Sequence, residues 1–186
     1  VTNLYRSGCT IKTHAGYVED PASAAGQCQY YVTGAMGRFE HPIITTTEEA
    51  LQYLDWDVVT RQQSFNKNRT KDFAAGMESC TPYAQTMIQY LKQNCPDARV
   101  CWQESWAYGV GYQHPNNEDE DPANDDPFLD VLDKETQVAM YEVIRDVCTA
   151  VCEQNEVDMI PTGDAWQLAR VTLGDTINRS DLAHDG

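Results

Sequence analysis

The chain has 186 residues, 41% of them hydrophobic and 10% aromatic, which is enough to bury one well-packed core. We therefore expect a single domain over residues 1–186. The formal net charge of -16 repels phosphate backbones and anionic lipid, which argues against a nucleic-acid partner. The sequence also lacks an apolar run of about eighteen residues, so it predicts no membrane span.

The first half of the chain contains three local structure signals. Residues 1–5 are typical of a β-strand, and Gly8 follows them. Thr46 and Glu49 form a capping-box pattern, which predicts a short helix through Leu54. Residues 56–61 are rich in β-formers and predict a second strand.

The second half alternates between helix and strand signals. Thr81 and Pro82 predict the start of a helix, because proline is tolerated in a first turn, and Cys95 predicts its end. Residues 98–103 predict a strand. Asp133 is placed to cap a long helix, whose apolar stripe is Met140, Ile144, Val147 and Val151. Residues 157–160 predict the next strand. Strands and helices in this alternation indicate an α/β fold with a parallel sheet and helices packed on it.

Polar or turn-forming residues follow each predicted strand. Each has a simple structural explanation on its own, such as a tight turn, a polar loop or a core aromatic ring. Together they predict one binding crevice, because loops at the carboxyl ends of parallel strands converge. The residues concerned are Gly8 after the first strand, Gln62, Gln63 and Ser64 after the second, Glu104, Ser105, Trp106 and Tyr108 after the third, and Pro161, Thr162, Gly163 and Asp164 after the last.

Two other groups of residues suggest metal chemistry at first sight, and neither fits a known pattern. Residues 116–127 are strongly acidic, but their spacing does not match an EF-hand loop, so we interpret them as a solvated surface insertion. The seven cysteines match no zinc signature and are interpreted as buried small side chains, with room for one disulfide. We expect neither a metal nor a cofactor.

Four ordered segments resemble the SGNH (GDSL-like) hydrolase superfamily, in a bacterial branch mostly described as domains of unknown function. Residues 4–10 with His14 are similar to that branch's "GGCSL…H" stretch, and residues 56–64 are similar to its "WDYITLQQ.S". Residues 103–108 are similar to "QTWAY", and residues 160–170 to "IPVG.AFQ.AR". The resemblance covers nearly the whole chain in the right order.

The resemblance implies a three-layer α/β/α sandwich of the flavodoxin-like type and ester hydrolysis by a Ser–His–Asp triad, with an acyl group on a carbohydrate as the substrate. It implies Gly8 and either Gln62 or Gln63 as oxyanion-hole donors, and Asp185 as the acid that orients the histidine. Ser64, Trp106, Tyr108, Gly163 and Asp164 would line the substrate pocket. The serine block of the family has no counterpart in the chain, nor do its first strand and helix, and the histidine expected two residues after Gly186 is outside the chain. We therefore expect an internal fragment that does not turn over alone.

Several alternatives remain open. Ser64, Cys9 with His14, or His184 would each offer a nucleophile or base inside the chain. The crevice could instead bind a sugar without catalysis, by stacking on Trp106, Tyr108 and Trp166. The resemblance suggests a bacterial protein, secreted or periplasmic, while the sequence fixes neither compartment nor oligomeric state.

Overall fold

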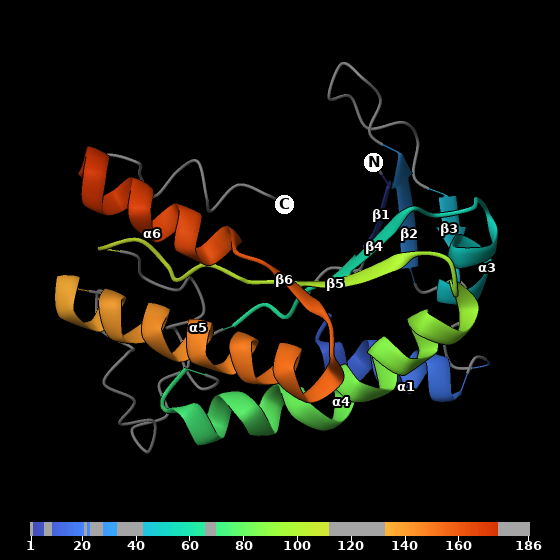
Figure 1. The fold of residues 1–186 in the computed structure, drawn as a ribbon, viewed down its shortest axis with the longest axis horizontal. Helices are drawn as coiled ribbons and strands as arrows, with labels where there is room; N and C mark the ends of the chain where they lie inside the picture. Colours follow the sequence, from blue (N-terminus) through green and yellow to red (C-terminus); the bar gives the residue numbers. More distant parts are fainter. Residues whose placement is uncertain are drawn as a thin grey trace, which may run out of the picture. The chain divides into compact units, whose positions relative to one another are not determined.

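The computed structural model describes residues 2–5, 9–20, 22, 28–32, 43–65, 70–111 and 133–174 (Figure 1). The chain divides into two compact units. The first consists of Val1–Thr60 and Thr81–Val100, and the second of Arg61–Cys80 and Cys101–Gly186. None of the helices in the described ranges is long and apolar enough to cross a bilayer.

The first unit contains an antiparallel sheet in the order β1-β2-β3. Its strands are β1 (Thr2–Tyr5), β2 (Cys28–Val32) and β3 (Ile43–Thr45), with Tyr30 of β2 opposite both Leu4 and Ile43. The prediction that the N-terminal strand joins the parallel sheet is therefore wrong. The sequence of β2, rich in tyrosine and valine, supplies an antiparallel partner instead.

Two short helices of the first unit begin at side-chain caps. Helix α1 (Ile11–Glu19) begins at Thr10, whose hydroxyl accepts from the Thr13 amide at 3.2 Å. Helix α3 (Thr47–Gln52) has the predicted capping box, in which the Glu49 amide donates to Thr46 and the Glu49 carboxylate accepts from the Thr46 amide. The helix ends two residues before the predicted Leu54, and it contacts α1.

The predicted parallel sheet is present with the strand order β4-β5-β6. Its strands are β4 (Val58–Arg61), β5 (Arg99–Gln103) and β6 (Asp158–Ile160). Strands β5 and β6 are parallel, with Cys101 opposite Asp158 and Gln103 opposite Ile160. Helix α4 (Phe73–Asn94) joins β4 to β5, and α5 (Lys134–Asn155) lies between β5 and β6 in the sequence. The alternating helix and strand pattern is thus confirmed.

Helix α4 begins eight residues before the predicted start, so that Pro82 lies inside it. The Asp72 carboxylate accepts from the Ala75 amide at 2.8 Å and caps the true N-terminus. A proline inside a helix removes one backbone hydrogen bond. The helix nevertheless starts at the Asp72 cap and continues through Pro82, so that Pro82 is not a first-turn residue.

The second unit has its core between α5 and the strands. Asp133 caps α5 as predicted, with the Thr136 amide donating to its carboxylate at 2.8 Å. The predicted stripe of Met140, Ile144, Val147 and Val151 is fully buried, and so is Trp102 of β5. Helix α5 contacts both β6 and α6 (Thr162–Leu173), and Figure 1 shows it running antiparallel to β6.

Candidate functional site

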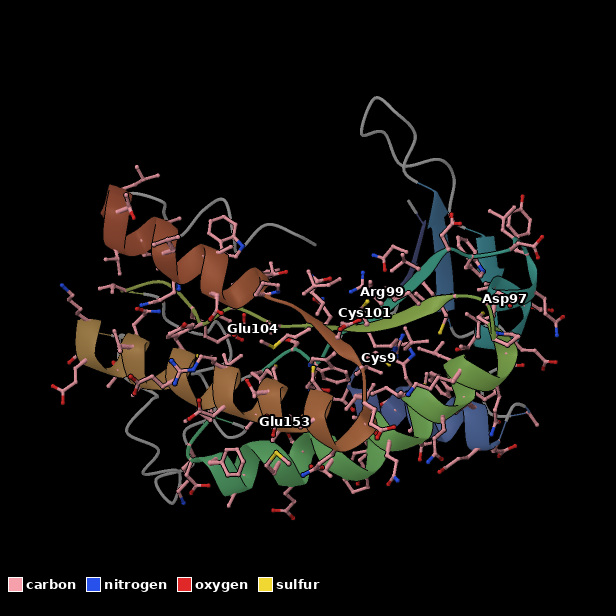
Figure 2. All side chains as sticks on the ribbon, in the orientation of Figure 1. Cys9, Asp97, Arg99, Cys101, Glu104 and Glu153 are labelled. Atoms are coloured by element: carbon pink, nitrogen blue, oxygen red, sulfur yellow. The ribbon has the colours of Figure 1, made fainter. Side chains whose placement is uncertain are left out.

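The candidate site lies in the second unit, where β5 and β6 end. The loop after β5 begins with Glu104, whose amide donates to the Ile160 carbonyl at 3.0 Å, and β6 leads through Pro161 into α6. Figure 2 shows Glu104 at the end of β5, near α5 and α6. The carboxyl ends of two parallel strands therefore meet the first turn of a helix, which is where open α/β sheets bind ligands.

Glu104 caps α6 from a different element. Pro161, the residue at the N-cap position of α6, makes no side-chain capping hydrogen bond. Instead, Glu104 Oε2 accepts from the backbone amide of Asp164 at 2.8 Å, and its carboxylate also accepts from the amide of Gly163. A carboxylate at this end of a helix satisfies unpaired N–H groups and complements the helix dipole. The end of β5 thus fixes the first turn of α6.

Gly163 permits this close approach. A Cβ atom at position 163 would collide with the Ser105 carbonyl oxygen and would lie 2.8 Å from Glu104 Cδ and 3.0 Å from Oε2. These contacts are with backbone and a buried carboxyl group, which have little room to move. The glycine is therefore required by the packing of α6 against the end of β5.

The Glu104 carboxyl group is completely buried, with 0% of the residue exposed. Its Oε1 atom has no hydrogen-bond partner among the described residues. Burial is the main cause that raises the pKa of Glu104, and the Asp164 carboxylate raises it further, while the two amide donors and Arg145 act in the opposite direction. Because no solvent reaches it, Glu104 supports the site rather than touching a ligand.

Asp164 is held by a second anchor on α5. The Tyr141 hydroxyl donates to Asp164 Oδ1 at 2.7 Å, and the Arg145 guanidinium lies over the Tyr141 ring, 5.5 Å from its centroid. Burial raises the pKa of the Tyr141 hydroxyl, and so does its bond to the Asp164 carboxylate. One turn further, the side-chain amides of Gln137 and Gln167 exchange hydrogen bonds of 2.9 and 3.3 Å. Backbone and side chain of Asp164 are thus fixed independently.

Two tryptophans lie beside this first turn. The rings of Trp106 and Trp166 have centroids 6.4 Å apart and planes inclined by 50°, and both residues are half-buried. The loop that carries Trp106 is anchored by Arg170, whose buried guanidinium donates to the Ala107 carbonyl at 2.7 Å. Partly exposed indole rings are the kind of surface that sugars contact.

The residues after β4 differ in their access to solvent. Gln62 and Ser64 are exposed, whereas Gln63 is 1% exposed and its side-chain amide donates to the Ser64 carbonyl at 2.6 Å. Gln62 is therefore the accessible candidate for an oxyanion donor, while Gln63 shapes the loop. Tyr108 is half-buried.

Four features singled out from the sequence lie outside the described residues. They are Gly8, the acidic segment 116–127, His184 and Asp185.

The cysteines near the site are buried thiols. Cys148 Sγ accepts from the Trp102 indole N–H at 3.3 Å and from the Ser105 amide, and burial raises its pKa to about 11. Burial also raises the pKa of Cys152 to about 12. Both thiols are therefore neutral at physiological pH, as is typical of buried structural cysteines. The described residues contain no group of three metal-ligating side chains.

Cys9 and His14, the alternative nucleophile and base, both belong to the first unit. Cys9 is half-buried and its thiol donates to the Thr10 carbonyl, with Sγ 3.7 Å from the oxygen. His14 is buried on α1, and its ring meets Tyr17 edge-on with centroids 6.2 Å apart. These contacts suit residues that pack α1 and its N-terminus.

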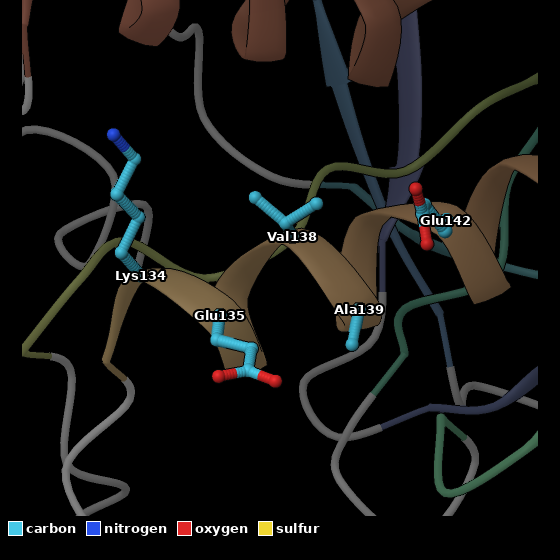
Figure 3. A pocket seen from close by; sticks show the side chains of 5 residues that line it. All are labelled: Lys134, Glu135, Val138, Ala139 and Glu142. Carbon is cyan, nitrogen blue, oxygen red and sulfur yellow. The ribbon is translucent and has the colours of Figure 1, made fainter.

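An open depression lies along the first three turns of α5 (Figure 3). All of its lining residues belong to this one helix: Lys134, Glu135, Val138, Ala139 and Glu142. It draws no group from a strand end and brings no converging polar atoms together, so we do not regard it as the functional site.

The sequence indicates Gly163, Asp164 and Trp106 as site residues but not the contacts that hold them. No local pattern reveals these contacts, because the partners are far apart in the sequence. The separation is 60 residues for Glu104 and Asp164, 23 for Tyr141 and Asp164, and 63 for Arg170 and Ala107. A charged residue that directly follows a buried strand is the one local signal for the role of Glu104.

Comparison with known proteins bears on the fold. No protein-family model matches the chain, and no curated protein matches it significantly. A crystal structure of a DUF4886 family protein from Bacteroides uniformis is similar, with a TM-score of 0.72 and 21% sequence identity. The similarity covers 96% of this chain and 61% of that one. At this level of identity the match shows a shared α/β fold, and the chain spans 61% of the length of the protein that it resembles.

Proposed function

We propose that the chain is part of an SGNH-type serine ester hydrolase that removes an acyl group from a carbohydrate. The observation that carries this proposal is the placement of the second, third and fourth resembling motifs. They contain β4 or the last residue of β5 and β6, together with the residues that follow each strand, in the order in which the superfamily has them. A shared fold alone would not support a reaction, because one fold serves many functions.

Each site residue has a role in this proposal. Ester hydrolysis by serine needs a nucleophile, an oriented base and donors for the oxyanion. The exposed side-chain amide of Gln62 serves as one oxyanion donor, and the resemblance assigns another donor to Gly8, which lies outside the described residues. The resemblance assigns the acid that orients the base to Asp185, and it identifies no serine or histidine counterpart among residues 1–186. Trp106 and Trp166 contact the sugar.

The test compares residues 1–186 with the protein encoded by the complete reading frame, using an activated acetyl ester. The complete protein hydrolyses the ester, and residues 1–186 alone do not. In the complete protein, Gln62→Ala lowers kcat by about 10²–10³-fold, the usual effect of losing an oxyanion donor. Gln85→Ala, an exposed glutamine on α4, serves as the matched control and keeps wild-type activity. Full activity of Gln62→Ala would remove the proposed role.

The Trp106–Trp166 pair favours a second candidate, a carbohydrate-binding module without catalysis. Indole faces stack on sugar rings, and the nearby Asp164 carboxylate accepts hydroxyl hydrogen bonds. Titration with neutral oligosaccharides, followed by tryptophan fluorescence, tests it. Trp166→Ala should abolish binding, Trp166→Phe should retain part of it, and Leu168→Ala on the exposed face of the same helix should leave it unchanged. Saturable binding by a complete protein that hydrolyses no ester would favour this candidate over the hydrolase.

A further inference from the structure

The first turn of α6 is held to the rest of the second unit by two kinds of contact. Tyr141 binds the side chain of Asp164, and Glu104 binds the backbone amides of Gly163 and Asp164. Tyr141 is neutral well above neutral pH, because burial raises its pKa from the ordinary value of 10.0. Of these two contacting side chains, Glu104 is therefore the one that titrates at the lower pH, and its pKa lies above the ordinary value of 4.5.

An ionised Glu104 is poorly satisfied in its position. Oε2 accepts from the Asp164 amide, and the Gly163 amide also favours the ionised form, but Oε1 has no partner among the described residues, and the residue is 0% exposed. Gly163 packs tightly against the other side of this carboxyl group, where even a Cβ atom would overlap Cδ and Oε2. A buried charge without full hydrogen bonding is costly, and such groups tend to take up a proton.

The charges that face Glu104 come from two helices. Asp164 of α6 opposes ionisation, and Arg145 of α5 favours it as the weakest of the contributing causes. Cys148 and Cys152 of α5 also lie within electrostatic range, but their pKa values of about 11 and about 12 keep them neutral. The surroundings of Glu104 thus include one anion and one cation of weaker effect, and no ion pair of Glu104 is found among the described residues, so a buried carboxylate is not compensated there.

We propose that Glu104 is a positioning residue whose protonation state sets how firmly the first turn of α6 is held against the end of β5, and with it the placement of Asp164 and Trp166. The direction of the pH effect follows from the linkage between proton binding and the packing of α6. We call the observed packing of α6 against the end of β5 the closed state, and a packing that hydrates Glu104 the open state. The closed state buries the carboxyl group and therefore binds its proton more tightly than the open state does. Protonation therefore favours the closed state, and rising pH favours opening. This inference does not depend on the hydrolase proposal.

Backbone amide hydrogen exchange at Gly163 and Asp164, measured by NMR between pH 5 and pH 8, tests the proposal. After correction for the intrinsic pH dependence, protection of these amides in the wild type falls at least about fivefold relative to amides in α5. Glu104→Gln, which mimics the protonated group, keeps constant protection over the same range. Tyr141→Phe leaves Glu104 intact and retains the wild-type pH dependence at lower overall protection.

A second variant should change the pH at which half of the amide protection is lost, without removing Glu104. Asp164→Asn deletes the neighbouring negative charge, so the loss of protection shifts to lower pH. Amides in the middle of α5 report whether each variant is folded. Protection that is independent of pH in the wild type would overturn the proposal. So would an equal pH dependence in Glu104→Gln, or an unchanged midpoint in folded Asp164→Asn.

Discussion

Glu104 Oε2 lies 2.8 Å from the backbone nitrogen of Asp164, so that the end of strand β5 caps the helix that follows β6. The residue before that helix makes no side-chain capping bond of its own. One carboxylate therefore joins the two loops that form the candidate site. We expect the geometry of the site to depend on residues that no ligand can reach.

Gly163→Ala should be strongly destabilising, because its Cβ would overlap the Ser105 carbonyl and the Glu104 carboxyl group. Overpacking of this kind lowers the free energy of unfolding by about 1–3 kcal/mol. Gly109→Ala is the matched control, since a Cβ there meets nothing within 4 Å, and it should change stability by less than about 0.5 kcal/mol. Urea denaturation measures both, and equal effects would contradict this packing of α6 against β5.

Glu104→Gln should alter how stability depends on pH. The pKa of Glu104 is raised in the folded protein, chiefly by burial, so the folded state binds more protons than the unfolded state above the ordinary value of 4.5. Its contribution to the free energy of unfolding is thus fully present below that value and is lost as pH rises through the raised pKa. Thermal denaturation at pH 5 and pH 8 should show a smaller difference for Glu104→Gln than for wild type. A larger difference in the variant would refute the assigned direction.

Tyr141→Phe should lower the free energy of unfolding by about 1–2 kcal/mol, because it removes a 2.7 Å hydrogen bond to the Asp164 carboxylate. The change keeps the ring and its contact with Arg145. A double-mutant cycle with Asp164→Ala isolates the pair. A coupling energy near zero would mean that the hydroxyl and the carboxylate do not stabilise each other in solution.

Native thiol labelling should be selective for Cys9. This residue is half-buried, whereas the other six cysteines are buried, and the pKa values of Cys148 and Cys152 are raised to about 11 and about 12. With Ellman's reagent at pH 8, we expect about one thiol to react quickly in the folded protein and all of them after denaturation in guanidinium. Cys9→Ser should remove the fast phase. A fast phase that survives this substitution would show that a buried thiol is reactive.

The sequence predicts those elements that have local signals. Asp133 as a cap and the stripe from Met140 to Val151 define α5 within a single segment, and the structure has both. Residues 98–103 and 157–160 are predicted as strands to within a residue, because β-formers lie between turn residues. The alternation of these elements is enough to predict the parallel arrangement of β5 and β6.

Predictions fail where a distant partner decides the outcome. The N-terminal strand pairs with β2 in an antiparallel sheet, and nothing in residues 1–5 specifies that partner. Pro82 has the appearance of a first-turn residue until the Asp72 cap is considered. For the site, turn chemistry indicates Gly163 and Asp164, whereas their anchor after β5 depends on packing between segments 60 residues apart.

The central claim, that these strand-end loops belong to a serine ester hydrolase, is tested most directly by a fluorophosphonate probe. The probe is added to the protein encoded by the complete reading frame, and the labelled peptide is identified by mass spectrometry. We expect one labelled serine outside residues 1–186, loss of labelling when that serine is replaced by alanine, and no labelling of residues 1–186 alone. Labelling of Ser64, or a folded complete protein that neither reacts with the probe nor hydrolyses an activated ester, would contradict the claim.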